Sequence, residues 1–214
     1  MRDVLFYPLA AALAGAFIFV ALDPYAARLP SGPVSAGGRN VEDVTVSGVE
    51  LHRFVTGEET GVSIDVRGAG DSGETVLWID RQAAAVYEDP RIGPHLVIAE
   101  DIEYAMESRP IEVIVEARAA GDFPANQFEV NYFAKVEGES GWQTFALTPD
   151  FQTYTLTFHT PKRDGDMGYD YIGIRPVAPD KHREMEVRSV RVRATAPKGA
   201  APSQAEQPAR EILP

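Results

Sequence analysis

The heptapeptide Thr-Tyr-Thr-Leu-Thr-Phe-His at residues 153–159 decides the fold, because its polar and apolar side chains alternate from end to end. A period of two is typical of a β-strand with one buried face. Residues 127–134 place Phe128, Val130, Tyr132 and Ala134 on one face in the same way. Similar short runs occupy residues 41–49, 61–67, 75–80, 95–102, 111–119, 142–147, 169–174 and 185–194.

About ten strands without a long helix predict an all-β domain. Only residues 81–87 look locally helical. Short antiparallel strands bury their apolar faces when two sheets pack face to face. The sequence therefore predicts an antiparallel β-sandwich.

The last predicted strand, residues 185–194, changes parity halfway along. Met185 and Val187 occupy odd positions, whereas Val190 and Val192 occupy even ones. A β-bulge adds one residue to a strand and shifts its alternation. We therefore predict a bulge near Ser189 that keeps all four side chains on the core side.

Four segments of the second half follow one another in a recognisable order. They are Ser108-Arg-Pro-Ile-Glu-Val-Ile-Val-Glu-Ala-Arg-Ala, Gly141-Trp-Gln-Thr-Phe-Ala-Leu-Thr-Pro-Asp-Phe-Gln-Thr-Tyr-Thr-Leu-Thr-Phe, Tyr171-Ile-Gly-Ile-Arg-Pro and Met185-Glu-Val-Arg-Ser-Val-Arg-Val. Over residues 101–194 this succession resembles the jelly-roll carbohydrate-binding modules of the galactose-binding-like superfamily. Phe151 stands where that family usually has Trp, and Arg188-Ser189 replaces its acidic pair before the closing valine.

The resemblance implies a jelly roll that binds a glycan on a concave sheet face or at loop tips, where aromatic rings stack on sugars. The candidate rings are Trp78, Tyr132, Trp142 and Tyr169. Large aromatic side chains also fill sandwich cores, so core packing stays open as the alternative for each ring. Phe133 and Asn131 have the parity opposite to the predicted core residues of their strand, which draws attention to that face.

An apolar run begins at Val4 and ends at Leu22. About 19 helical residues span roughly 28 Å, close to the thickness of the hydrocarbon core. We expect residues 1–28 to be an uncleaved transmembrane anchor in the inner membrane, with the bulk of the chain on the periplasmic side. A cleaved signal peptide is the alternative.

Composition sets the remaining boundaries. Residues 29–38 are rich in Pro, Gly and Ser and predict a linker, residues 39–195 the sandwich domain, and residues 196–214 a disordered tail. A net charge of −12 and a pI near 4.8 argue against a nucleic-acid partner. The chain has no cysteine, which excludes disulfides and thiolate metal sites.

Motifs that suggest catalysis are weak. Gly70-Asp71-Ser72-Gly73 matches the letters around a serine protease nucleophile, but His52, the only upstream histidine, is too near. These four residues read better as a turn. Asp and Glu are abundant, so pairs such as Glu112 and Glu116 carry little information about glycoside hydrolysis. We expect no enzymatic activity.

An acidic loop suggests the one cofactor. Asp164, Asp166 and Asp170 offer hard oxygen ligands that suit a structural calcium ion. A solvated turn is the alternative interpretation. The four histidines show no spacing typical of a transition-metal site.

Two hypotheses about function remain. The first is a membrane-anchored extracytoplasmic module that binds polysaccharide without catalysis of its own. The second is an accessory subunit of a larger membrane protein complex, with the sandwich as a protein-docking domain. Exposed rings favour the first, and a broad apolar surface patch favours the second.

Overall fold

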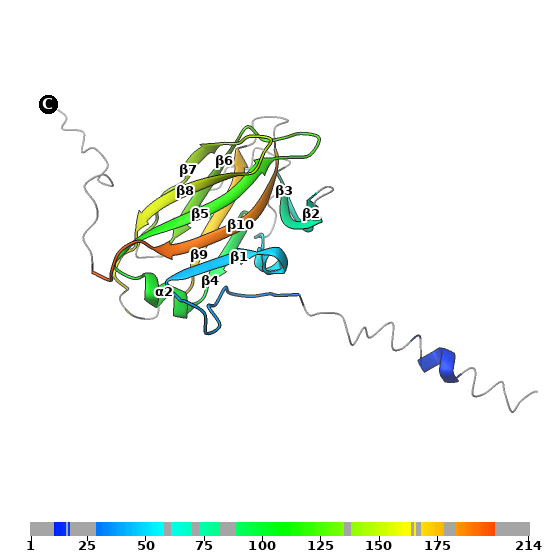
Figure 1. Cartoon of the computed structure of the whole chain (residues 1–214), viewed down its shortest axis with the longest axis horizontal. Coiled ribbons are helices and arrows are strands. Elements are labelled where there is room, and N and C mark those ends of the chain that lie inside the picture. The colour runs from blue at the N-terminus through cyan, green and yellow to red at the C-terminus, as the bar shows by residue number, and fades with distance from the viewer. Residues whose placement is uncertain are drawn as a thin grey trace, which may run out of the picture.

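The computed structural model describes residues 11–15, 17, 29–57, 61–69, 73–81, 89–134, 138–163, 165, 168–177 and 183–199. Its named strands form two antiparallel sheets, which pack on each other as two layers (Figure 1). The predicted antiparallel β-sandwich is confirmed.

The larger sheet has six strands. Five follow the order β2 (Val62–Ala69), β3 (Glu74–Arg81), β10 (Glu184–Ala194), β5 (Pro110–Ala119) and β8 (Gln152–His159). The sixth, β1 (Asp43–Ser47), pairs with residues 189–193 of β10. Strand β3 pairs with residues 184–187 on the same edge of β10. Strand β8 ends this sheet.

The smaller sheet has four strands in the order β4 (His95–Ile98), β9 (Asp170–Val177), β6 (Gln127–Phe133) and β7 (Gln143–Ala146). Consecutive strands such as β7 and β8 belong to different sheets. The chain therefore crosses repeatedly between the two layers, and β7 and β8 end their sheets on the same side of the sandwich (Figure 1).

The inner faces follow the predicted alternation. In β5 the buried residues are Ile111, Val113, Val115 and Ala117, and in β6 they are Phe128, Val130 and Tyr132. All belong to one hydrophobic core cluster. Burial of each such side chain contributes about 1.5–3 kcal/mol relative to exposure, so the core between the layers is the main source of stability.

The predicted bulge in β10 is confirmed. The register with β5 shifts between Val187 and Ser189, which leaves Arg188 as the extra residue. Met185, Val187, Val190 and Val192 are all buried as a result.

The strand predicted over residues 95–102 is wrong in its second half. Strand β4 ends at Ile98, and helix α2 (Glu100–Met106) follows. Ile102 and Met106 lie one helical turn apart and are both buried, while acidic residues in the first turn suit the helix dipole. Similarly, the strand predicted over residues 41–49 ends at Ser47, where the 3₁₀ helix η1 (Gly48–Arg53) begins.

The segment predicted as a linker contributes to the core. Val34 and Ala36 are buried in the main cluster. Val34 forms a parallel bridge with Ile98, and its amide donates to the carbonyl of Val97 at 2.7 Å. The packed part of the chain therefore begins before residue 39.

Several predictions fall largely outside the described residues. Of the tail predicted over residues 196–214 only residues 196–199 are described, and of the turn predicted at residues 70–73 only Gly73 is described. Of the expected anchor, only residues 11–15 and 17 are described, and these are helical. Within the described part of the chain, no helix has the length and apolar character needed to span a membrane. Of residues 81–87, which were predicted to form a local helix, only Arg81 is described, and it belongs to strand β3.

Candidate functional site

The outer face of the four-stranded sheet carries aromatic side chains. Phe133 on β6 and Tyr171 on β9 are register partners whose ring centroids lie 6.4 Å apart. Both rings are half-buried, although they point away from the core. Outward positions of antiparallel sheets are usually polar. We call the set Phe133, Trp142, Tyr171, Arg91 and Arg175 the ring face.

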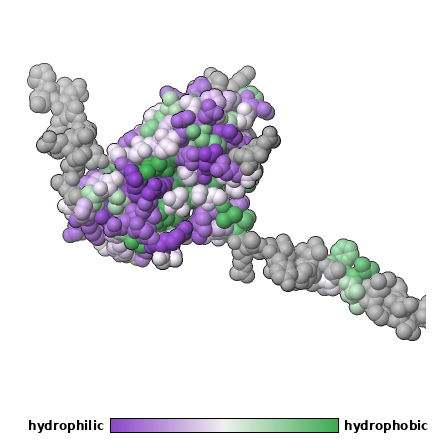
Figure 2. Space-filling view, viewed as in Figure 1, coloured by the Kyte–Doolittle hydropathy of each residue, from purple (hydrophilic) through white to green (hydrophobic). Residues whose placement is uncertain are grey.

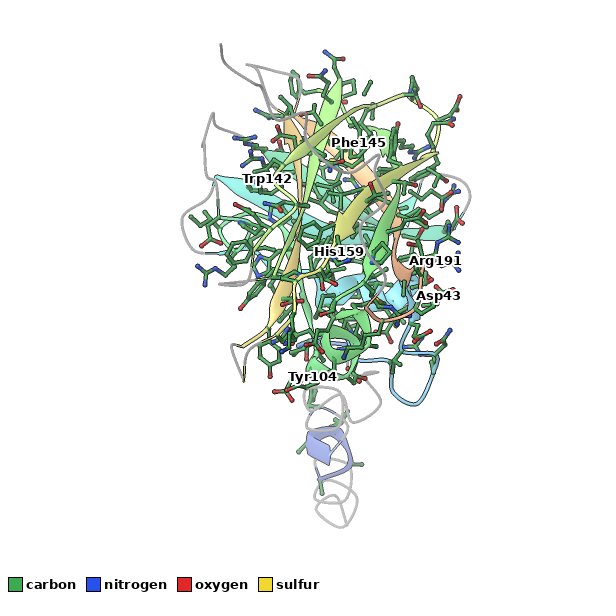
Figure 3. All side chains as sticks on the ribbon, turned by 90° about the vertical axis from the view of Figure 1, so that its left-hand side faces the viewer. Asp43, Tyr104, Trp142, Phe145, His159 and Arg191 are labelled. Atoms are coloured by element: carbon green, nitrogen blue, oxygen red, sulfur yellow. The ribbon has the colours of Figure 1, made fainter. Side chains whose placement is uncertain are left out.

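Trp142 lies against this sheet immediately before β7. A Cβ atom added to Gly173 would lie 2.8 Å from the indole Cη2 of Trp142 and 2.6 Å from Cβ of Pro90. Only glycine leaves room for such an approach. The guanidinium of Arg175 covers the indole, with its Cζ 3.8 Å from the ring centroid. Figure 3 shows Trp142 on the side of the sandwich opposite to Arg191 and Asp43.

Arg91 lies beside the other two rings. Its Cζ is 5.7 Å from the centroid of Phe133 and 5.9 Å from that of Tyr171. Hydrogen bonds from Arg91 to both carboxylate oxygens of Asp89 hold the arginine in place and lower the pKa of Asp89. Because 44% of the Arg91 side chain remains exposed, a ligand can still reach it.

Polar side chains between the rings are fixed by hydrogen bonds. The buried Asn131 donates through Nδ2 to Glu139 at 2.8 Å and accepts from the hydroxyl of Ser140 at 3.1 Å. His95 is buried edge-on against Tyr171, with ring centroids 5.6 Å apart. Burial lowers the pKa of His95, so its imidazole is neutral near pH 7.

The charges on this face are balanced in pairs. Nε of Arg175 donates to Glu129 at 2.6 Å, as Arg91 does to Asp89. The ring face therefore combines flat apolar surfaces with hydrogen-bonding groups and little net charge. Such a surface can stack on the apolar faces of an uncharged polar molecule and bond its hydroxyl groups.

The outer face of the six-stranded sheet differs in character. Cross-strand ion pairs cover it, including Arg193 with Glu112 at 2.6 Å and Arg188 with Glu116 at 2.8 Å. Figure 2 views the molecule from this side and shows hydrophilic residues over much of the surface. Exposed pairs of this kind each add only about 0–1 kcal/mol, so they mainly keep the face soluble.

The structure separates the four predicted rings. Trp142 belongs to the ring face, whereas Trp78 lies on the other sheet beneath Arg67, whose Cζ is 4.5 Å from its ring centroid. Tyr132 is fully buried and offers no surface to a ligand. Tyr169 is 42% exposed in the segment before β9.

Asp170, one of the predicted calcium ligands, is buried in a charged cluster. Its carboxylate accepts a 2.7 Å hydrogen bond from the hydroxyl of Tyr132 and a 3.1 Å bond from Arg163. Asp164 and Asp166 lie outside the described residues. Among the residues that the structure describes, no three His, Asp or Glu side chains are grouped to hold a metal. The calcium site stays a prediction.

Glu103 on α2 completes this cluster. Its carboxylate accepts the amide of Asp170 and lies 3.0 Å from Nη1 of Arg163. Burial raises the pKa of Glu103 to about 7, and the nearby carboxylate of Asp170 adds to the effect.

Sequence reasoning missed Tyr171, Arg175 and Arg91. The first two alternate with the buried Ile172 and Ile174 along β9, so their outward direction was readable from the sequence. Arg91 lies in a loop, where alternation gives no information.

Two adjoining open grooves lie away from the ring face. One has a volume of about 670 Å³ between α2 and the segment after β10. The other has about 500 Å³ beside the start of β1. Arg109 and Glu42 form an ion pair of 2.8 Å on the wall of the larger groove.

No family model matches the chain, and no curated protein is similar to it in sequence. Among solved structures, the chain is similar to the CBM22-1 xylan-binding domain from Paenibacillus barcinonensis Xyn10C, at 11% identity and a TM-score of 0.49 over 73% of this chain and 95% of that one. It also matches the tandem CBM22-1-CBM22-2 domain of that protein, at 11% identity and a TM-score of 0.46 over 72% of this chain, and spans only 43% of the tandem chain.

A third similar structure is a putative sugar binding protein from Bacteroides thetaiotaomicron, at 10% identity and a TM-score of 0.46, covering 79% of this chain and 96% of that one.

Proposed function

We propose that the ring face binds an uncharged polysaccharide, without catalysis. The observation that carries this proposal is the gathering of Phe133, Trp142 and Tyr171 on the outer face of a sheet, where each side chain remains partly exposed. Flat rings of this kind bury the apolar faces of sugars. The hydrogen-bonded groups among the rings supply partners for hydroxyls.

The charge of the molecule supports an uncharged ligand. Both arginines of the ring face are paired with carboxylates. The chain as a whole carries a net charge of −12, which repels anionic polymers at long range. The proposal extends to location, because the apolar run of residues 4–22 would hold such a module at a membrane surface.

The two tryptophans allow a direct test, since one lies on each sheet. In the variant Trp78→Phe, Trp142 is the only tryptophan, and its emission should change in a saturable way as the bound glycan is added. In the matched control Trp142→Phe, the emission of Trp78 should stay constant. The full chain would first be screened against neutral polysaccharides by affinity electrophoresis.

The result that would overturn the proposal is equally clear. If no neutral polysaccharide retards the chain and neither variant responds, the ring face is not a glycan site. A response from Trp78 alone would place a glycan on the six-stranded sheet instead.

A further inference from the structure

Strand β8 has one free edge. It pairs with β5 over eight residues, from Ala117 with Gln152 to Pro110 with His159. On its other side, no strand of the described chain pairs with it. In Figure 1, β8 forms the left-hand border of the front sheet. Alternate backbone amides and carbonyls along this border therefore have no strand to bond.

The sequence of β8 lacks the usual protection of an edge. Proteins commonly place Lys, Pro or a bulge on edge strands to prevent pairing with another chain. Residues 151–158 contain no charge and no proline, in a chain with 24% charged residues. The nearest charged residues are Asp150 before the strand and Lys162 after it.

The side chains of β8 are also incompletely covered. Tyr154 and Phe158 point toward the core, yet both are only half-buried, unlike Leu156 between them. The hydroxyl of Tyr154 is shielded from solvent without a hydrogen-bond partner in the described structure. Figure 3 views the sandwich from this side, where Phe145 and His159 lie near the open border.

We propose that β8 pairs antiparallel with β8 of a second copy of this chain, with Thr155 on the twofold axis. An antiparallel pair of identical strands is self-complementary, and residues opposite each other share a face of the sheet. In this register Thr153 faces Thr157 and Tyr154 faces Leu156. The two six-stranded sheets then become continuous.

The charges at the two ends of β8 favour a second copy as the occupant. Two molecules of net charge −12 repel each other at long range, but the uncharged strand places no like charges at their closest approach. In the proposed register Asp150 of one copy faces Thr160 of the other and comes within two residues of its Lys162. The contact is small, and small contacts give weak complexes. Association should strengthen with added salt, because salt screens the net repulsion.

Single cysteines test the pairing in the full chain, which has none of its own. Directly opposed residues in antiparallel strands have Cα atoms about 4.5–5.5 Å apart, within disulfide range. Thr155→Cys should therefore form a covalent dimer under mild oxidation, seen by non-reducing electrophoresis. Thr45→Cys, an exposed position on the same sheet face in β1, is the matched control. A several-fold excess of dimer for Thr155→Cys is expected.

A mixture of Thr153→Cys and Thr157→Cys chains should cross-link more than either variant alone, which checks the register. Sedimentation equilibrium gives an independent readout: Thr155→Lys, with two lysines facing each other, should stay monomeric where the parent chain associates. If Thr155→Cys dimerises no faster than Thr45→Cys, or if the parent chain sediments as a monomer at every concentration and salt level, the proposal is wrong.

Discussion

The buried cluster around Glu103 predicts a specific dependence of stability on pH. The pKa of Glu103 is about 7 in the folded chain, against an ordinary value of 4.5. A raised pKa means that the folded state binds the proton more tightly than the unfolded state. The stabilisation of the folded chain by protonated Glu103 is therefore fully present below pH 4.5 and is lost as the pH rises through about 7. The charged and titratable groups that interact with Glu103 include Arg163, Asp170, Glu100 and Tyr132.

The size of this contribution follows from the shift. Each pKa unit corresponds to about 1.4 kcal/mol, so the rise from 4.5 to about 7 amounts to about 3 kcal/mol of unfolding free energy lost across that interval. Glu103→Gln removes the titrating group while leaving an oxygen that can accept the Asp170 amide. Between pH 4.5 and 8, the unfolding free energy of the parent chain should therefore decrease by about 3 kcal/mol more than that of Glu103→Gln.

The assay is denaturant unfolding at several pH values, followed by circular dichroism. Asp65→Asn is the matched control, because Asp65 is an exposed carboxylate on β2 and is not among the groups that shift the pKa of Glu103. Only the pH dependence is compared, since the new amide also alters the contact with Arg163. If Glu103→Gln and the parent chain lose the same free energy over this interval, the reasoning about burial of Glu103 is refuted.

Three further predictions concern the ring face, a turn and the core. Gly173→Ala should displace the indole of Trp142 and weaken glycan binding, at a stability cost of about 1–3 kcal/mol; Gly68→Ala, whose Cβ has its nearest neighbour at 4.0 Å, should bind normally in the same titration. Ser108 has φ = 54°, a left-handed conformation that favours glycine, so Ser108→Gly should raise the free energy of unfolding by up to about 1 kcal/mol and the melting temperature with it. An unchanged or lower melting temperature would contradict this. Leu156→Ala should cost about 2–5 kcal/mol in denaturant unfolding because Leu156 is fully buried, and a loss below 1 kcal/mol would show that the site collapses.

Alternation along the chain predicted the layers of this fold well, because period two directly reports which side of a strand is buried. It located the break in β10 near Ser189 correctly, since a parity change has few other causes. It failed at α2, where Ile102 and Met106 are too few to separate a short helix from a strand.

The candidate site was harder to predict for a different reason. Alternation separates inward from outward residues but does not say whether a ring is exposed. Alternation gave the directions of Tyr132 and Phe133 in β6 correctly, but it could not show that the outward ring of Phe133 lies half-buried beside Tyr171. Trp142 lies outside any strand, and its position depends on the missing side chain of Gly173, a contact between distant segments.

The N-terminal segment also has a mechanical consequence. Val34 bonds to the edge strand β4, and Nη1 of Arg53 donates to the carbonyls of Ser31 and Pro33 at 2.8 and 3.2 Å. Tension applied ahead of residue 29 therefore reaches Arg53 of η1 and then β4, a strand of the sheet that carries the ring face. A polymer held on that face and the N-terminal segment would therefore both pull on the four-stranded sheet.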